Sequence, residues 1–346
     1  MDDPRLQIPP AFAIGLIVAV AAVLIATAVL WRVVRGVVEQ GAGSEGSLQR
    51  VRWLMRAALF AAVVGLATAA VTAASAPAID PSPSSAPAVP AENPWSLVWS
   101  DDFEGSAGTA PDPEYWTHET GGSGWGNDEL QYYTDSPDNA SLDGNGNLAI
   151  TARRTAPDAT ELECWYGPCA FTSARLITAQ KQEFTYGRFE TRVRVPEGAG
   201  LWPAVWMLGS DFAEVGWPQT GEIDIMEFVG NSPNNVFGTI HGPGYSGGQA
   251  YSGDFALQNP VPDEWHVFTV EWTPENITWT IDGAVFHEAD PTDVAPNEWV
   301  FDHPFFLLTN MAVGGNFGGD VGDDVTFPRE FTVDYVRVYR HSSSTN

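Results

Sequence analysis

From about residue 97 onward, the sequence predicts an all-β domain, a β-sandwich of the jelly-roll type. Short apolar runs rich in β-branched and aromatic residues recur there, separated by turns of Gly, Asn, Asp and Pro. No convincing amphipathic helix interrupts them, and the chain of 346 residues contains 14 Trp, 34 Gly and 26 Pro. Many short antiparallel strands over this length favour two packed sheets joined by long loops.

The first 76 residues differ in character from the rest and predict a membrane or export segment. The apolar runs 11–31 and 57–74 each have the composition of a hydrophobic helix, and the first is long enough to span a bilayer. If both are transmembrane helices, the Arg-rich stretch 32–56 lies in the cytoplasm and the main domain lies outside. This is the interpretation that we favour.

Translation from Met55 gives a second interpretation, in which the later apolar run is the core of a signal peptide cleaved near Ala76. Both interpretations predict an extracytoplasmic main domain, which is anchored in the membrane in one case and secreted in the other. Residues 77–96 are rich in Pro, Ala and Ser and predict an extended linker. Residues 97–340 then form one domain, and 341–346 form a short tail.

Strand-like runs follow one another through this domain, without a repeat period. They lie at 147–153, 171–178, 186–195, 203–208, 222–229, 236–241, 265–272, 276–281, 305–312 and 331–339. The pair Asp282-Gly283 between two of these runs predicts a tight hairpin.

The charge balance limits the classes of molecule that the protein is expected to bind. The chain carries 16 basic and 44 acidic residues, a net charge of −28. Such a surface argues against nucleic acid and anionic polymers and suits a neutral substrate. We expect a monomer. The two cysteines, Cys164 and Cys169, predict a short loop-closing disulfide in an exported chain, and two free thiols are the alternative.

Three carboxylates gather in Gly221–Gly230, which reads GEIDIMEFVG and predicts a strand with one buried face. Because side chains on a strand alternate, Glu222 and Asp224 share a face while Glu227 points to the other. A single-residue β-bulge near Met226 would return Glu227 to the face of Glu222, and such bulges are common beside active sites.

Three acids on one strand face repel one another and are costly to desolvate, which a packed core would not favour. A site that needs one ionised and one protonated carboxyl would favour them. Hydrolysis of a glycoside with retention uses two carboxyl groups ~5–5.5 Å apart. Cα atoms four positions apart on a strand are ~13 Å apart, so Glu222 and Glu227 would have to lean toward each other. A polar strand face in water is the less favoured alternative.

Several further residues are candidates for contacts to a ligand. Trp202 and Trp206 share a strand face and offer a stacking platform for pyranose rings, although two core tryptophans explain the spacing equally well. Arg175 lies in a strand run, where a buried Arg needs an acid partner or a ligand hydroxyl. His241 follows the acids and would hydrogen-bond the substrate or a site carboxylate, or lie satisfied in the core.

Other motifs point away from metal or phosphate chemistry. Asp143–Asn147 resembles the start of an EF-hand loop, but Leu148 replaces the required Gly and no Glu closes the loop, so a turn is expected. The sequence shows no zinc cluster, no phosphate loop and no Gly-x-Ser-x-Gly elbow. We therefore expect no cofactor for catalysis.

The acid stretch, with LWPAVWMLG before it, TIHGPGY after it and VDYVRVY near the end, resembles glycoside hydrolase family 16. It is most similar to the bacterial laminarinase branch, the endo-β-1,3-glucanases, over about residues 97–340. The resemblance implies a concanavalin-like jelly roll and a retaining endo-glycosidase that hydrolyses laminarin-like β-1,3-glucan by double displacement. Glu222 is then the nucleophile, Glu227 the acid/base, and Asp224 the residue that tunes the nucleophile.

The resemblance also implies a set of binding residues and one structural calcium. The residues matching the substrate cleft are Trp202, Trp206, Asn127, Glu129, Arg175 and His241, and those matching the calcium site are Glu104, the carbonyl of Gly146, and Asp334.

Three features depart from the family pattern. Phe317 stands where relatives often have Trp, the loop of Cys164 and Cys169 looks inserted, and the double apolar N-terminus is unusual. Two alternatives remain open: a non-catalytic, lectin-like β-glucan-binding module, and the same chemistry on mixed-linkage glucan or agar-type galactan.

Overall fold

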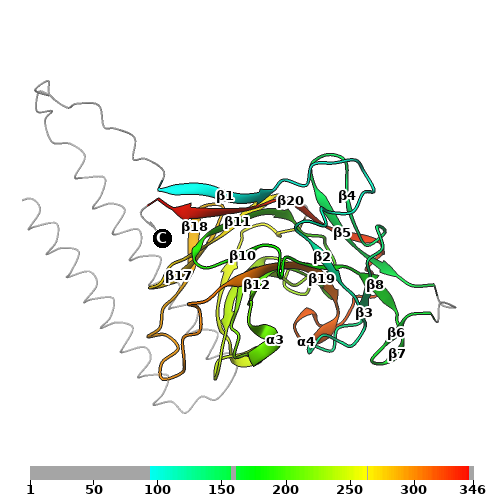
Figure 1. Cartoon of the computed structure of the whole chain (residues 1–346). Coiled ribbons are helices and arrows are strands. Elements are labelled where there is room, and N and C mark those ends of the chain that lie inside the picture. The colour runs from blue at the N-terminus through cyan, green and yellow to red at the C-terminus, as the bar shows by residue number, and fades with distance from the viewer. Residues whose placement is uncertain (1–93, 157–160, 263, 343–346) are drawn as a thin grey trace, which may run out of the picture. The chain divides into compact units, whose positions relative to one another are not determined.

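The structure is a computed structural model that describes residues 94–156, 161–262 and 264–342. Over these ranges two large, mostly antiparallel β-sheets pack against each other (Figure 1). The helices found there are single turns, α3 (Phe212–Val215) and α4 (Gly315–Gly318), together with the 3-10 turn η1 (Gly247–Gln249). The predicted all-β sandwich is therefore confirmed.

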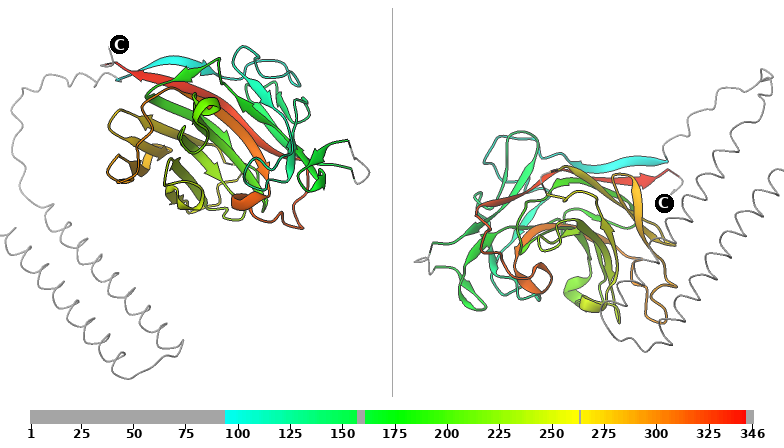
Figure 2. Two further views of the ribbon diagram at one scale, coloured as in Figure 1. Left: turned by 60° about the horizontal axis from the view of Figure 1, so that its bottom comes forward. Right: turned by 180° about the vertical axis from the view of Figure 1, so that it is seen from behind.

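The ten-stranded sheet forms one layer, in which β1 and β20 run side by side (Figure 2). Its strands, in spatial order, are β18 (Ala284–Ala289), β17 (Ile277–Ile281), β16 (His266–Trp272), β11 (Gly187–Arg194), β20 (Arg329–His341), β5 (Leu148–Arg154), β8 (Phe171–Ser173) and β3 (Gln131–Tyr133), with β1 (Trp95–Asp101) paired to β20 and β4 (Ala140–Leu142) paired to β5.

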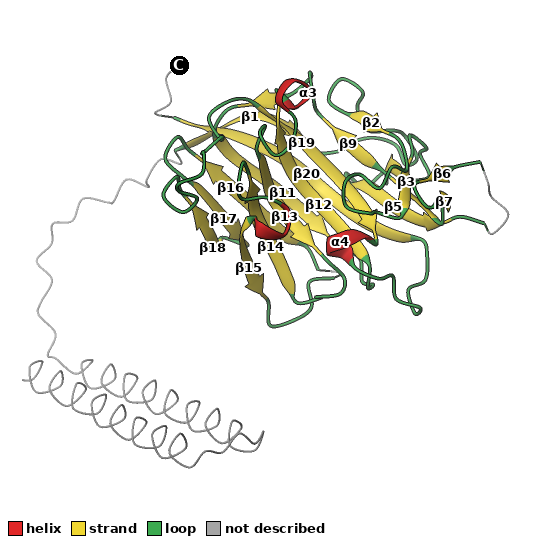
Figure 3. Cartoon of the chain, turned by 90° about the horizontal axis from the view of Figure 1, so that it is seen from below, coloured by secondary structure: helices red, strands yellow, loops and turns green. Residues whose placement is uncertain are grey.

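The eight-stranded sheet forms the other layer, and α3 and α4 lie on its side of the sandwich (Figure 3). Its strands, in spatial order, are β15 (Tyr251–Ala256), β14 (Asn235–His241), β13 (Glu222–Phe228), β12 (Leu201–Gly209), β19 (Phe305–Val313), β9 (Arg175–Ile177) and β2 (Thr117–Glu119), with β10 (Glu183–Phe184) paired to β19. A separate pair is formed by β6 (Glu163–Cys164) and β7 (Gly167–Pro168).

A β-bulge interrupts β13 between its second and third acid. Asp224 pairs with Thr239 and Glu227 pairs with Phe237, so two residues of β13, Ile225 and Met226, face one residue of β14. Ile225 and Met226 are both buried in the core between the sheets. The bulge predicted near Met226 is thus confirmed, and it returns Glu227 to the face of Asp224, away from the core.

Trp279 of the ten-stranded sheet packs directly beneath this bulge. Its indole Nε1 donates a 2.7 Å hydrogen bond to the backbone carbonyl of Asp224. Opposite the bulge on β14 lies Gly238, where an added Cβ would come within 2.4 Å of Trp279 Cδ1. The absence of a side chain at Gly238 therefore lets a buried Trp reach the strand that carries the acids.

The other strand predictions hold, with one exception. The run 171–178 is broken at Ala174, where the chain leaves the ten-stranded sheet as β8 and enters the eight-stranded sheet as β9. The predicted hairpin joins β17 to β18, with positive φ at Asp282 and Gly283. The predicted disulfide between Cys164 and Cys169 is present.

The predicted apolar helices at 11–31 and 57–74 lie outside the described residues. Among the residues that are described, no helix is both long and apolar enough to cross a membrane.

The packing of Trp279 against Gly238 predicts a position-specific loss of stability. Gly238→Ala should lower the free energy of unfolding by about 1–3 kcal/mol, because the new methyl group meets a fully buried indole. Urea denaturation followed by fluorescence measures this. Gly248→Ala is the control, since no heavy atom lies within 4 Å of its added Cβ. Equal stability of the two variants would contradict the packing described.

Candidate active site

Glu222 begins β13 and accepts one hydrogen bond from an indole, with a histidine ring nearby. The indole Nε1 of Trp217 donates to Glu222 Oε2 at 3.0 Å, and Nε2 of His241 lies 3.6 Å from Glu222 Oε1. Trp217 comes from the loop after α3 and is 43% exposed. Trp217 was not among the predicted site residues, although the sequence places a Trp-Pro pair five residues before the first acid.

His241 lies beside the site carboxylates. Of the predicted roles, which were contact with the substrate, contact with a site carboxylate and a place in the core, the structure shows the second. Its Nδ1 accepts a 3.1 Å hydrogen bond from the backbone N–H of Gly247, which leaves the proton of the neutral ring on Nε2. That Nε2 lies 3.2 Å from Oδ2 of the buried Asp224. His241 is thus a close neighbour of both carboxyl groups, while Oδ2 of Asp224 has no hydrogen-bond partner among the described residues.

Glu227 lies on the same face and has its own indole donor. Nε1 of Trp202, in the neighbouring strand β12, donates to Glu227 Oε1 at 3.1 Å. Trp206 also lies on this face, because it pairs with Asp224 across the strands while Ala204 pairs with Glu227. Both tryptophans are half-buried, so the shared aromatic face that we predicted is confirmed.

The three carboxyl groups cannot all be ionised at neutral pH. Burial, followed by the charge of Asp224, raises the pKa of Glu222 and of Glu227 to about 8. Burial also raises the pKa of Asp224 to about 8, against a hydrogen bond with Glu222 that lowers it. The cluster therefore keeps at least one proton near neutrality, as a site with one acid and one nucleophile requires.

Arg175 lies between two indole rings next to this cluster. Its guanidinium carbon is 4.8 Å from the ring centroid of Trp206 and 4.7 Å from that of Trp125. Its Nε pairs with Oε2 of Glu119 at 2.5 Å. The acid partner expected for a buried Arg is thus Glu119, and the guanidinium plane is free to stack on the aromatic side chains.

Glu129 lies beneath the site, with 4% of its surface exposed. It accepts hydrogen bonds from Asn127 Nδ2 at 3.1 Å and from the hydroxyl of Tyr133 at 3.0 Å. That hydroxyl accepts from Asn310 Nδ2 at 3.0 Å, and Asn310 Oδ1 accepts from Trp206 Nε1 at 2.7 Å. Glu129 therefore positions Trp206 through two intervening side chains, and burial raises the pKa of Glu129.

An aromatic cluster lies beside Glu227. The ring of Phe317 is 5.4 Å from Trp202 and 5.1 Å from Phe237, edge-on in both cases. Phe317 is 39% exposed, so the position where relatives often have Trp still presents an apolar ring. Phe237 is a site neighbour that the strand pattern alone did not single out.

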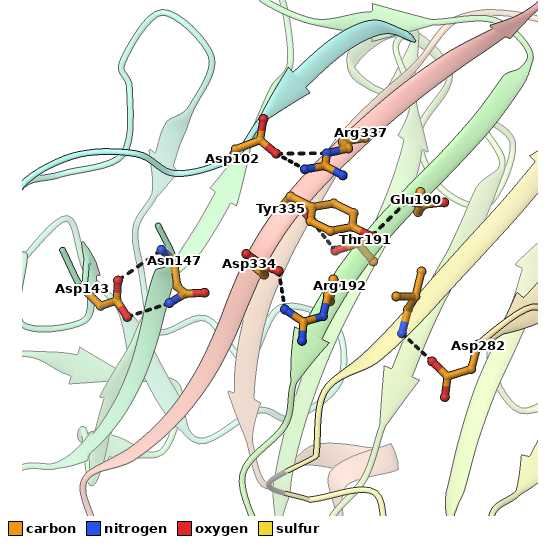
Figure 4. A network of polar contacts seen from close by, with 11 residues as sticks. Asp102, Asp143, Asn147, Glu190, Thr191, Arg192, Asp282, Asp334, Tyr335 and Arg337 are labelled. Carbon is orange, nitrogen blue, oxygen red and sulfur yellow. Dashed lines mark hydrogen bonds and ion pairs between the residues drawn. The ribbon is translucent and has the colours of Figure 1, made fainter. Parts of the chain in front are cut away.

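The residues implied as calcium ligands fit that role in part. A Cβ on Gly146 would lie 3.4 Å from Glu104 Oε1, so the backbone of Gly146 is near this carboxylate. The carboxylate of Asp334 instead pairs with Nη1 of Arg192 at 2.5 Å (Figure 4). Within the described part of the chain, the side chains with metal-ligand spacing are Glu222, Asp224 and His241, which belong to the candidate active site.

The turn expected at Asp143–Asn147 is also present. Asp143 accepts hydrogen bonds from the backbone N–H and the side-chain amide of Asn147 (Figure 4).

Comparisons with known proteins agree with this geometry. The family model described as "Glycosyl hydrolases family 16" matches residues 127–337. A β-glucanase from Rhodothermus marinus is 44% identical over 257 residues, which cover 71% of this chain and 85% of the relative. The laminarinase catalytic domain from Thermotoga maritima has a TM-score of 0.66 at 42% identity, covering 73% of this chain and 99% of that one. The endo-β-1,3-glucanase from Pyrococcus furiosus has a TM-score of 0.65 at 44% identity, covering 71% and 94% respectively.

The buried acids predict a pH-dependent cost in stability. Folding raises the pKa of Glu227 from 4.5 to about 8. The free energy of unfolding of the protein therefore falls as the pH rises from 4.5 to about 8. Glu227→Gln keeps an acceptor oxygen for Trp202 and removes the charge. It should stabilise the protein by about 1–2 kcal/mol at pH 8, and the gain should vanish near pH 4.

Thermal denaturation at both pH values measures this difference. Glu275→Gln, in the exposed turn before β17, is the control and should show no such pH dependence. A stabilisation by Glu227→Gln that is equal at pH 4 and pH 8 would mean that the carboxyl group is not destabilised by burial.

Proposed function

The chain belongs to glycosyl hydrolases family 16 and is a glycoside hydrolase of the laminarinase type, and from that premise we propose that it hydrolyses β-1,3-glucan with retention. The observation that carries the proposal is the bulge in β13, which places Glu227 on the face of Glu222 and Asp224. The proposal is also supported by the sequence identity of this chain to relatives named as β-glucanase, laminarinase and endo-β-1,3-glucanase.

The proposed reaction is a double displacement on two carboxyl groups. Glu222 attacks the anomeric carbon of a glucosyl unit while Glu227 donates its proton to the leaving glycosidic oxygen. A covalent glycosyl–enzyme results, and Glu227, now ionised, removes a proton from the water that releases the sugar. Asp224 and His241 lie beside Glu222, and Trp217 donates to Glu222 Oε2, so that the attacking carboxyl group stays oriented.

The substrate is proposed to be a neutral polysaccharide that lies across the eight-stranded sheet. The indoles of Trp202 and Trp206 stack on pyranose rings on either side of the cleavage point. A net charge of −28 disfavours anionic polymers. A lectin-like role would not require three buried carboxyls with raised pKa values, because binding alone gains nothing from them.

We also propose an extracytoplasmic location, with the first 76 residues acting as an anchor or an export signal. Two observations support this location: the apolar runs of the N-terminal sequence, and the disulfide between Cys164 and Cys169, a bond typical of oxidising compartments. A structural calcium is proposed at Glu104 and the carbonyl of Gly146, because a carboxylate, an oxygen ligand that this ion prefers, lies near the backbone of Gly146.

Substitution of either glutamate should abolish turnover without unfolding the protein. Glu222→Ser and Glu227→Ser should each reduce laminarin hydrolysis by about 10³-fold or more and leave glucan binding intact. A reducing-sugar assay measures turnover, and affinity electrophoresis in laminarin measures binding. Glu271→Ser, on the ten-stranded sheet, is the control. Turnover retained in either site variant would defeat the assignment.

The same assay on laminarin, lichenan and agarose tests the polymer. Preferential hydrolysis of laminarin is the expected result, and a preference for lichenan or agarose would replace the substrate while keeping the chemistry.

The two indole donors should control opposite limbs of the pH–rate profile. Each N–H bond favours the ionised carboxylate, so its loss raises the pKa of that carboxyl. Trp217→Phe should shift the acidic limb of kcat/KM upward by about half a pH unit to one unit, because Glu222 must be ionised to attack. Trp202→Phe should shift the basic limb upward, because Glu227 must be protonated. A shift of the opposite limb in either variant would reverse the two roles.

A further inference from the structure

A short hairpin closed by the disulfide carries two exposed aromatic residues. The disulfide hairpin, residues 163–169, consists of β6, β7 and the bond between Cys164 and Cys169. At its tip Trp165 is 52% exposed and Tyr166 is 37% exposed. Their rings lie 5.4 Å apart at 85°, so each braces the other. Exposed aromatic residues are common singly, but a braced pair at the tip of a cross-linked hairpin is not explained by packing.

The hairpin is attached to the loop that carries Asn127 and Glu129. Trp165 Nε1 donates to the carbonyl of Glu129 at 2.9 Å, and the hydroxyl of Tyr166 donates to the carbonyl of Leu130 at 2.6 Å. The backbone N–H of Trp165 donates to the carbonyl of Gly122 at 2.8 Å. Figure 3 shows β6 and β7 beside β3, the strand into which this loop leads.

These contacts use the polar edges of both rings, and both side chains remain exposed. An added Cβ on Gly124 would lie 2.9 Å from Trp165 Cδ1, so the hairpin lies close against the loop. Two ring donors, one backbone bond and one disulfide fix the orientation of the rings. A ligand that stacks on them would therefore lose little additional side-chain entropy on binding.

The hairpin is continuous with the active site through stacked side chains. Trp206, which pairs with Asp224, contacts the guanidinium of Arg175, and Arg175 contacts the ring of Trp125. Trp125 belongs to the Gly-rich turn on which the hairpin rests, and its indole donates to the carbonyl of Gly121 at 3.1 Å. These contacts thus link Trp206 to the turn against which Trp165 packs.

The chemistry of the hairpin fits a neutral sugar. Residues 161–170 contain two glutamates and no Lys or Arg, so nothing there attracts an anion. The C–H face of a pyranose ring stacks on an aromatic ring without needing a charged partner. We propose that Trp165 and Tyr166 form an additional binding site for a glucosyl unit of the β-glucan chain, beyond the units held beside Glu222 and Glu227.

This inference rests on the proposed function and adds to it a preference for long chains. The test compares laminarin with an aryl β-laminaribioside, which spans only the sugar positions beside the acids. Trp165→Ala should lower kcat/KM on laminarin by about three- to tenfold, through KM. It should leave kcat on laminarin and both constants on the aryl substrate unchanged.

Two further variants separate binding from bracing of the loop. Trp165→Gln keeps a side-chain N–H donor but has no ring, so it should lose the same affinity for laminarin as Trp165→Ala. Trp265→Ala is the matched control, because this Trp stacks on Arg192 of the ten-stranded sheet, 4.5 Å from ring centroid to guanidinium carbon. It should leave hydrolysis of both substrates unchanged.

The outcomes are distinct. An equal loss on both substrates would show that the hairpin is a structural brace, and no loss on laminarin would show that its rings bind no glucan; either result overturns the proposal. Failure of the wild-type protein to cleave laminarin would instead overturn the proposed function, and this proposal with it.

Discussion

The site depends on one backbone irregularity and on the indole that holds it. The bulge at Ile225 and Met226 adds one residue to β13, and the alternation of the strand then restarts with Glu227 on the face of Asp224. The carbonyl of Asp224 accepts from Trp279, which reaches it because Gly238 has no side chain. A core residue of the opposite sheet therefore fixes the geometry of the acids.

The indole donors around the acids orient these side chains without adding positive charge. Glu222 accepts from Trp217 and Glu227 accepts from Trp202. A nearby guanidinium or ammonium would lower the pKa of all three carboxyls and remove the proton that an acid catalyst must keep. Arg175 lowers the pKa of Glu222, but burial and the charge of Asp224 outweigh it. Arg175 is itself paired with Glu119 and stacked between indoles. The buried acids therefore lose stability but retain that proton.

Local sequence pattern was enough to predict the features that arise within one strand or one turn. The acids, the bulge, the Asp282-Gly283 hairpin and the shared face of the two tryptophans follow from strand period and turn chemistry. Features set by pairing between distant segments could not be predicted this way. The break at Ala174, the burial of Glu129, the contact of Trp217 with Glu222 and the pairing of Asp334 with Arg192 all depend on which strands and loops become neighbours.

The chemistry and the proposed preference for long glucan chains depend on different parts of the molecule. The acids are held from the core by Trp279 and from neighbouring strands by Trp202 and His241. The aromatic surface beyond them comes from the loop around Trp125 and from the disulfide hairpin, which joins the rest through backbone carbonyls. Contacts to a backbone carbonyl do not depend on the identity of the residue that supplies it. If the hairpin binds glucan as proposed, a change at its tip should therefore alter the binding of long chains without disturbing Glu222, Asp224 or Glu227.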